Sequence, residues 1–256
     1  MHKRLIPFMA QPTLLMDFLT DSYNAGGAIS LLALNGLFTL IHKHKLEYPD
    51  FYKKLYALFD RNLMHVKYRA RFFRLATIFL ASTHIPAYLV AAFIKRMARL
   101  SLSAPPSGVA IIIPFIYNLL RQHPACIVLI HRVPGQDEQS ASTIAGLDND
   151  PYLPDEADPA KCQAIDSSLW EIQALDQHYY ANVATLSQIF SQHFNKPSYD
   201  LEDFVDHTYS TLFDAEVNRR IKKTPAIAYY SEPTLFDDAS SLMHDWDMDM
   251  TPEAMP

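Results

Sequence analysis

The chain contains only six glycines in 256 residues, and this scarcity is the strongest constraint on its fold. Glycine supplies the positive backbone φ that tight hairpin turns and phosphate-cradling loops need. Average usage is about 7%, so hairpin-rich all-β folds and nucleotide-binding folds built on Gly-rich loops are disfavoured. A helical fold is the expectation that remains.

Apolar residues recur at helical spacing over most of residues 10–130 and again over 167–221. One segment shows the pattern clearly, because its apolar residues fall at i, i+4, i+7 and i+11: Tyr68, Phe72, Leu75 and Phe79. That spacing places them on one face of a helix, with Arg71 and Arg74 on another face. We therefore expect the aromatic set to be core and the two arginines to be exposed.

The periodic segments predict about nine helices joined by short connections, without strands of useful length. Residues 109–122 are nearly all apolar and are expected to form a central buried helix, with Pro114 at a kink or in the first turn. Residues 200–221 are the clearest late helix. Since no strict repeat of about 40 residues is visible, we predict an all-α, irregular HEAT-like or armadillo-like stack.

Charge divides the chain into two unlike halves. Residues 1–134 carry 16 Lys and Arg against 5 Asp and Glu, whereas residues 135–256 carry 6 against 23. An acidic stretch rich in turn formers, residues 133–166, interrupts the helical pattern. The expected organisation is a basic helical part (1–132), an acidic loop insert (133–166), a second helical part of the same domain (167–230) and a disordered acidic tail (231–256).

The motifs of common enzyme classes are absent. The sequence contains no G-x-x-x-x-G-K, no G-x-G-x-x-G and no G-x-S-x-G. His42 and His44 lack a third metal ligand, and Cys126 and Cys162 have no closely spaced partner, which favours a reducing compartment. The longest apolar runs are far shorter than the roughly 18–20 residues of a membrane span. We predict no catalytic residues, no cofactor, no metal and no membrane segment.

Two consecutive predicted helices carry basic strips. Their residues are the first candidate contact set: Lys67, Arg69, Arg71, Arg74, Lys95, Arg96 and Arg99. An ordinary solvated helix face, contact with RNA phosphates and docking of an acidic segment, including one from this chain, all remain open. On the second helix we expect the three basic side chains to point outward.

The acidic insert supplies the second candidate contact set. Its carboxylates, with a nearby aromatic anchor, are Asp148, Asp150, Asp155, Glu156, Asp158 and Trp170. Because crowded carboxylates repel one another, ordering them requires a cationic neighbour within the chain or on a partner. Ser167 or Ser168 is expected to cap the following helix, with Glu171 at capping-box distance from Ser168. We predict a docking element, internal or intermolecular.

Three long runs resemble the C-terminal domain of the CCAAT-binding-factor (CBF) family. They are residues 17–60 (beginning DFLTDSYNAGG), 67–132 (KYRARFFRLATIFL) and 150–180 (DPYLPDEADPAKCQAI). The likeness runs from about residue 9 to 236, nearly the whole chain, and generic helical repeats do not share these motifs. It begins where the C-terminal half of such proteins begins, so we expect the N-terminal helical half to be missing.

The resemblance implies a helical repeat protein of the nucleus and nucleolus without catalytic activity. It further implies a scaffold subunit in small ribosomal subunit assembly and pre-rRNA maturation, bound to nucleolar protein fourteen within the small-subunit processome. Other processome proteins would be partners, contact with pre-rRNA would be indirect, and no DNA is expected. The alternative is a direct pre-rRNA-binding module that uses the basic helix faces. A hydrolase is disfavoured by the missing motifs.

Overall fold

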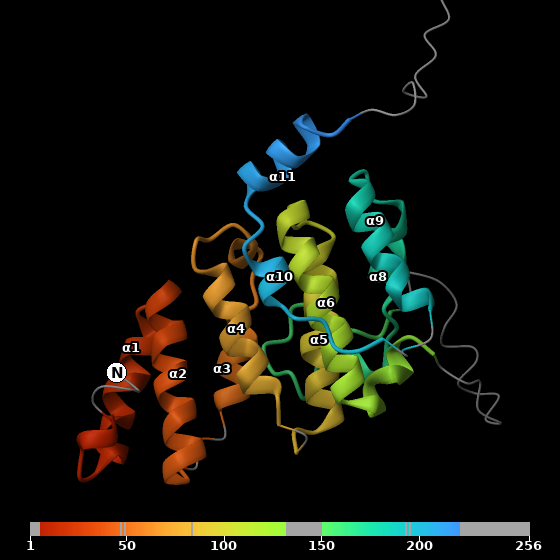
Figure 1. Ribbon diagram of the computed structural model, residues 1–256. Coiled ribbons are helices and arrows are strands. Elements are labelled where there is room, and N and C mark those ends of the chain that lie inside the picture. Colours follow the sequence, from red (N-terminus) through yellow and green to blue (C-terminus); the bar gives the residue numbers. More distant parts are fainter. Residues whose placement is uncertain are drawn as a thin grey trace, which may run out of the picture. The chain divides into compact units, whose positions relative to one another are not determined.

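The computed structural model describes residues 6–220 except 47, 49, 83, 132–149, 193 and 195, and the regular elements in these residues are all helical (Figure 1). The expected all-α class is therefore confirmed for the described residues. The acidic tail and residues 133–149 of the insert lie outside them. Contacts divide the chain into two compact units, residues 1–213 and 214–256. Of the second unit, the described residues are 214–220.

Short 3₁₀ turns η1 (Ile6–Phe8) and η2 (Pro12–Leu15) lead into α1 (Met16–Asn24) and α2 (Gly27–His44). Gly26 joins the two helices with φ at +83°, a conformation that suits glycine. A Cβ atom on Gly36 would lie 2.9 Å from a methyl of Leu19, so α1 and α2 approach closely there. Glycine is thus used where the backbone needs it.

The central helices are α3 (Phe51–Ala57), α4 (Arg69–Leu80), α5 (Ala87–Ser101) and α6 (Pro106–Gln122), with the 3₁₀ turn η3 (Arg61–Met64) before α4. Phe72 and Phe79 of α4 are buried and Arg71 and Arg74 are exposed, as the spacing predicts, whereas Tyr68 and Leu75 are only partly buried against the core. Helix α6 is the expected central helix, with Pro106 at its start. Pro114 lies inside α6 rather than in its first turn.

The later elements are shorter than their periodicity suggests. They are η4 (Pro124–Leu129), η7 (Ala164–Asp166), α8 (Trp170–Ala174), η8 (Leu175–Gln177), α9 (Ala181–Ser187), η9 (Gln188–Ser191), α10 (Glu202–Val205) and α11 (Tyr209–Val217). The single helix expected over 200–221 is wrong, because the described chain breaks between α10 and α11. Thr208 and Thr211 bond each other's backbone at the break, an alternative to continuing the helix.

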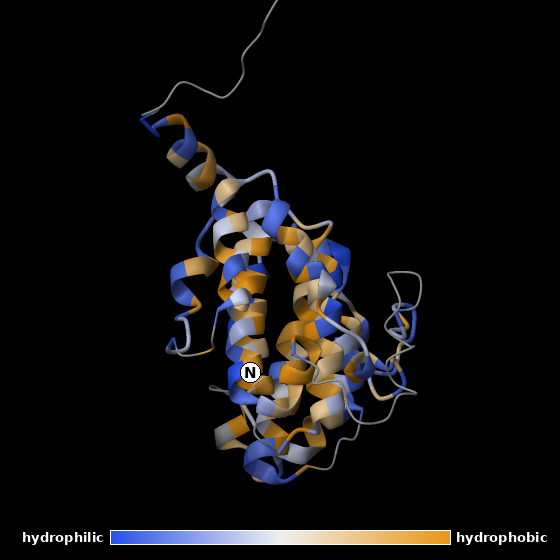
Figure 2. Ribbon diagram, turned by 90° about the vertical axis from the view of Figure 1, so that its right-hand side faces the viewer, coloured by the Kyte–Doolittle hydropathy of each residue, from blue (hydrophilic) through white to orange (hydrophobic). Residues whose placement is uncertain are grey.

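Within residues 1–213 the helices lie side by side in sequence order. Helix α1 packs on α2, α2 on α3 and α4, α5 on α6, and α6 on α9, while α10 crosses back to α4 and α6. Apolar residues line the faces between these helices and polar residues the outward faces (Figure 2). This layering accords with a helical stack, whose repeat type stays a prediction.

The second part of the insert packs into this core. Tyr152, Cys162 and Ala164 are buried, and the Tyr152 hydroxyl lies 2.9 Å from that of Tyr56 in α3. The backbone N–H of Leu153 donates to the carbonyl of Cys162 at 3.0 Å and closes the loop. Residues 150–166 are therefore not a passive linker, because they cover α5 and supply part of the hydrophobic core.

Candidate interaction site and its buried ion cluster

Lys95 does not point outward. Its side chain is completely buried on α5, so the expected outward placement is wrong for this residue. Ala91 and Ala98, one turn before and after it, are also fully buried and leave room for its long stem. A lysine between two alanines is equally typical of a solvated helix face, so the sequence carries no signal that identifies Lys95 as internal.

The Lys95 ammonium belongs to a cluster of four charged side chains, called the ion cluster below: Lys95, Arg99, Asp150 and Glu171. Lys95 Nζ lies 2.9 Å from Asp150 Oδ2 and 2.7 Å from Glu171 Oε1, and it donates to the carbonyl oxygen of Ser168 at 2.6 Å. Arg99 adds a contact of 3.3 Å to Asp150 and one of 3.1 Å to Glu171. The Arg99 Nε–Glu171 Oε1 contact lacks hydrogen-bond alignment and is purely ionic.

The cluster is charge-balanced, which makes its burial tolerable. Two cations face two carboxylates, and the side chains of Lys95 and Glu171 are 0% exposed. An unpaired charge at this depth would be strongly destabilising, whereas a hydrogen-bonded pair is not. The cluster thus attaches the 150–171 segment to α5 from both of its ends.

Hydrogen bonds fix the Asp150 carboxylate in its charged form. Burial alone raises the pKa of Asp150, but donation from the Ser167 hydroxyl (2.5 Å), the Trp170 indole N–H (3.0 Å) and Lys95 outweighs it and lowers the pKa to about 2. Burial raises the pKa of Glu171, and the attraction of Lys95 opposes that rise. Asp150 is therefore the firmly ionised member of the cluster.

The expected capping box before α8 is wrong. Leu169 occupies the N-cap position, without a capping hydrogen bond from its side chain. The Ser167 hydroxyl bonds Asp150 instead, and Glu171 turns to Lys95. The Asp150 carboxylate and the Lys95 ammonium offer these two polar groups charged partners, which bind them more strongly than the helix N-terminus does.

Trp170 belongs to the cluster more than to an open surface. Its indole N–H is bound to Asp150, and its ring lies 4.8 Å from the Arg99 guanidinium carbon and 5.6 Å from Lys95 Nζ. These cation–π contacts hold the ring against α5. The side chain remains half-buried, so only part of it faces solvent.

Two other basic residues are also bound within the chain. Arg69 donates to the carbonyls of Met64 and His207 at 2.7 and 3.0 Å. Arg96 donates to the Phe59 carbonyl at 2.7 Å, and its guanidinium lies 4.3 Å from the centre of the Tyr56 ring. These contacts tie helices together.

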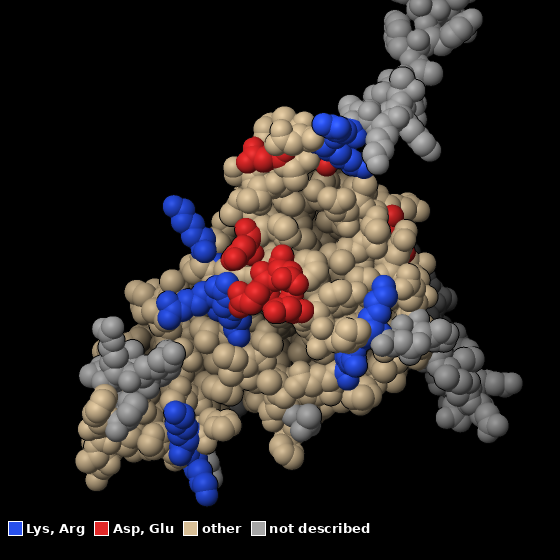
Figure 3. Space-filling view, in the orientation of Figure 1, with Lys and Arg blue, Asp and Glu red and all other residues tan. Residues whose placement is uncertain are grey.

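Arg74 joins α4 to α10 at the surface. Its guanidinium donates to both oxygens of Glu202, at 2.5 to 3.0 Å, and lies 3.6 Å from Asp206. Figure 3 shows acidic side chains gathered over α10 with basic ones beside them. Of the basic candidates, Lys67 and Arg71 are exposed and lie outside these contacts.

The structure separates the acidic candidates. Asp148 lies outside the described residues, and Asp150 is buried in the ion cluster. Asp155 is exposed, whereas Glu156 and Asp158 are half-buried and accept backbone N–H groups two residues ahead at 3.1 Å. Asp150 is therefore bound within the chain, and the role of the acidic candidates in partner binding stays a prediction.

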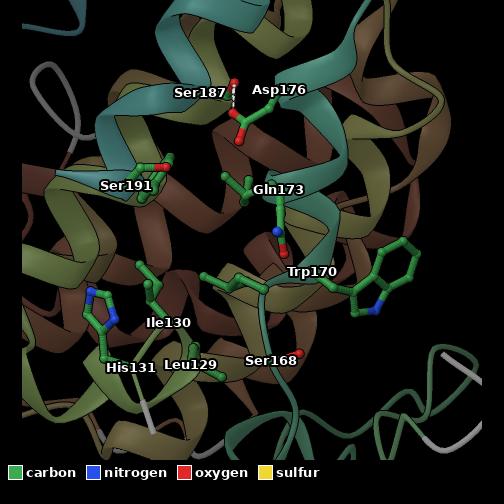
Figure 4. A pocket seen from close by; sticks show the side chains of 12 residues that line it. Leu129, Ile130, His131, Ser168, Trp170, Gln173, Asp176, Ser187 and Ser191 are labelled. Carbon is green, nitrogen blue, oxygen red and sulfur yellow. Dashed lines mark hydrogen bonds between the residues drawn. The ribbon is translucent and has the colours of Figure 1, made fainter. Parts of the chain in front are cut away.

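A slot of about 310 Å³ opens beside the ion cluster (Figure 4). The end of η4 forms one wall, and α8, η8, α9 and η9 form the others. Its apolar lining consists of Leu129, Ile130, Leu169, Trp170, Ile172 and Phe190. The Leu169 N–H donates to the Leu129 carbonyl at 2.9 Å and ties the two walls together at the base.

Asp176 brings a carboxylate to this slot. The buried Ser187 hydroxyl donates to its Oδ1 at 2.5 Å, and Figure 4 shows the other oxygen directed toward the open space. Gln173 and Ser191 lie exposed on opposite sides of the slot. Sequence reasoning missed this site, because its residues come from two segments about 40 positions apart that carry no motif.

The described part of the chain contains no group of three or more His, Cys, Asp or Glu side chains arranged to hold a metal ion. Within the same residues, no helix has both the length and the apolar character to cross a membrane.

The sequence pattern of the CBF/Mak21 family matches residues 30–187. The chain is 54% identical over 245 residues to an uncharacterized protein of Schizosaccharomyces pombe, which covers 96% of this chain and 47% of that protein. It is 48% identical to nucleolar complex protein 4 of Saccharomyces cerevisiae, over 93% of this chain and 46% of the relative. The human nucleolar complex protein 4 homolog is 52% identical, over 86% and 41%. The chain thus spans somewhat less than half the length of these relatives, and the names of the last two agree with the expected nucleolar location.

Proposed function

The chain belongs to the CBF/Mak21 family, and on this premise we propose that it is a non-enzymatic scaffold subunit in small ribosomal subunit assembly. It acts in the nucleolus through a complex with nucleolar protein fourteen and supports pre-rRNA maturation. The relatives named nucleolar complex protein 4, at about 50% identity, support the coarser part of this proposal, a nucleolar factor of ribosome biogenesis. The small-subunit assignment and the partner are the more specific claims of this proposal.

The ion cluster is the observation that carries the scaffold role. Its acidic groups face cations of the same chain at 2.7 to 3.3 Å and hold the 150–171 segment on α5. A catalytic acid or base must reach the proton that it transfers. These carboxylates are instead bound to the cations of α5 and attach the 150–171 segment to that helix. The cluster builds a rigid surface for a partner.

Affinity purification of the tagged full chain, followed by mass spectrometry, tests this proposal. Nucleolar protein fourteen and other small-subunit assembly proteins should co-purify at high enrichment after nuclease treatment. Enrichment of large-subunit assembly factors in their place, or loss of all partners after nuclease treatment, contradicts the scaffold role.

Direct binding of pre-rRNA is the alternative function. The internal contacts of the basic side chains make it less favourable. Five of the seven candidate side chains contact other groups of this chain, which leaves Lys67 and Arg71 as the two exposed candidates outside these contacts. For single-stranded RNA, the logarithm of the binding constant falls linearly with the logarithm of the salt concentration, with a slope near −0.7 per phosphate contact. Two contacts therefore correspond to a slope of about −1.4. A mobility-shift series with pre-rRNA across salt concentrations should give a slope this shallow, and a much steeper one favours the alternative.

Three acids of the insert, of which Asp155 is exposed and Glu156 and Asp158 are half-buried, are proposed to contact a basic partner surface. Charge reversal of Asp155, Glu156 and Asp158 to Lys should weaken capture of nucleolar protein fourteen, most of all at low salt. A matched control reverses three exposed acids elsewhere, namely Asp17, Asp21 and Asp50. Equal binding by the two variants and the wild type means that the insert is only a structural element.

A further inference from the structure

The slot beside α8 combines the features of a peptide anchor site. About 310 Å³ lies at the lower end of the range of roughly 300–1,000 Å³ for ligand pockets, which suits one or two large side chains. Six apolar residues line it, and one carboxylate oxygen, that of Asp176, is directed into it. A complementary occupant is apolar at its tip and carries a positive charge beside it.

The electrostatic surroundings favour a cationic occupant. Residues 168–191, which build the walls other than that of η4, contain two carboxylates, Glu171 and Asp176, and no Lys or Arg. Lys95 and Arg99 neutralise Glu171, so Asp176 gives the slot a negative charge. Such a field attracts basic chains and repels RNA phosphates, which makes a protein segment the fitting partner.

The slot is also held in shape before any partner arrives. Ser187 fixes one oxygen of Asp176, the Leu169 N–H fixes the base, and the ion cluster holds Trp170 at the edge. Preorganised groups lose little conformational freedom on binding, so more of the contact energy appears as affinity.

We propose that this slot receives a short segment of a partner protein, with an aromatic or aliphatic side chain in the slot and a Lys or Arg paired to Asp176. The exposed Gln173 and Ser191 supply polar contacts for its backbone. The inference rests on the proposed scaffold function, because it assigns that function a surface and gives the partner segment a chemistry.

Binding of purified nucleolar protein fourteen to the full chain, measured by titration calorimetry, tests the proposal. Ser191→Trp fills the slot from its rim and should weaken binding at least tenfold. Gln188→Trp places the same bulk on the same short helix at an exposed position outside the slot, and should bind as the wild type does.

Asp176→Asn is the second variant, because an amide keeps the contact with Ser187 and removes the charge. It should weaken binding by about three- to tenfold and reduce the salt dependence of the affinity. Thermal melts of each variant establish that the fold is retained. If wild type binds and both slot variants bind equally well, the slot proposal is overturned while the scaffold function stands.

Absence of wild-type binding to nucleolar protein fourteen overturns that partner and leaves the slot to a second experiment. Synthetic 15-residue peptides tiling the proteins that co-purify with the full chain are then titrated against wild type and Asp176→Asn. The proposal holds if the Asp176-dependent peptides pair an apolar residue with Lys or Arg within four positions, and it is overturned if none does. Self-association lost in Ser191→Trp, seen by sedimentation, assigns the slot to a second copy and also overturns it.

Discussion

Replacing Lys95 by Met removes the cation at the centre of the ion cluster while preserving most of the side-chain volume. Lys95 Nζ contacts Asp150, Glu171 and the Ser168 carbonyl within 3.0 Å, and its side chain is 0% exposed. After the substitution, two carboxylates face Arg99 alone, whose side chain is 33% exposed. Removing one partner of a buried pair costs about 3–5 kcal/mol.

That loss is a large part of a typical unfolding free energy of about 5–15 kcal/mol. Urea unfolding at pH 7, followed by circular dichroism at 222 nm, should show a clear fall in the transition midpoint. For a chain of this size, about 2–4 °C per kcal/mol applies, so the thermal midpoint should fall by roughly 6–20 °C. Lys67→Met, at an exposed site, should change stability by no more than about 0.5 kcal/mol.

The double variant Lys95→Met, Glu171→Leu separates charge from packing. Removing both charges leaves Asp150 paired with Arg99, so the double variant should be less destabilised than the sum of the two single variants. Additive losses, or a Lys95→Met protein as stable as the wild type, would refute the assignment of a buried, charge-coupled cluster.

The remaining predictions concern core faces, proton linkage and thiol access. Phe72→Ala should cost about 3–5 kcal/mol in urea unfolding, and Arg71→Ala should stay within about 0.5 kcal/mol, since the first side chain is buried and the second exposed; similar losses would contradict the face assignment. With its pKa lowered to about 2, the charged Asp150 carboxylate stabilises the fold fully above about pH 4, and about 2 kcal/mol is lost as pH falls toward 2; the stability difference between wild type and Asp150→Asn should shrink over that interval. Cys126 and Cys162 are buried, and burial raises the pKa of Cys126 to about 11, so Ellman's reagent at pH 8 should label them only after unfolding; rapid labelling of the folded chain would contradict this.

Helix periodicity predicted the middle of the molecule well because its helices bury one continuous face. Phe72 and Phe79 follow that face through α4, and residues 109–122 are apolar enough to require a central position. The family resemblance also followed from long sequence runs, and the CBF/Mak21 match over 30–187 confirms it. These features depend on local spacing, which a sequence displays directly.

The ion cluster could not be found in this way, because its members are far apart in the chain. Asp150 lies 55 positions after Lys95, and Glu171 lies 76 positions after it. A lysine among alanines resembles a solvated helix face until its counter-ions are located. Local rules also misassigned Ser167, whose hydroxyl was expected at a helix cap and is held instead by Asp150.

The same sequence separation bears on the order in which the molecule assembles. Contacts between α5 and α6 close short loops, whereas the ion cluster closes loops of 55 and 76 positions, which carry a larger entropy of closure. We expect the cluster to form late, after the central helices have collapsed. Interactions absent from the folding transition state chiefly slow unfolding. The cluster would then slow the unfolding of the subunit and so lengthen the lifetime of its folded state, with little effect on the folding rate.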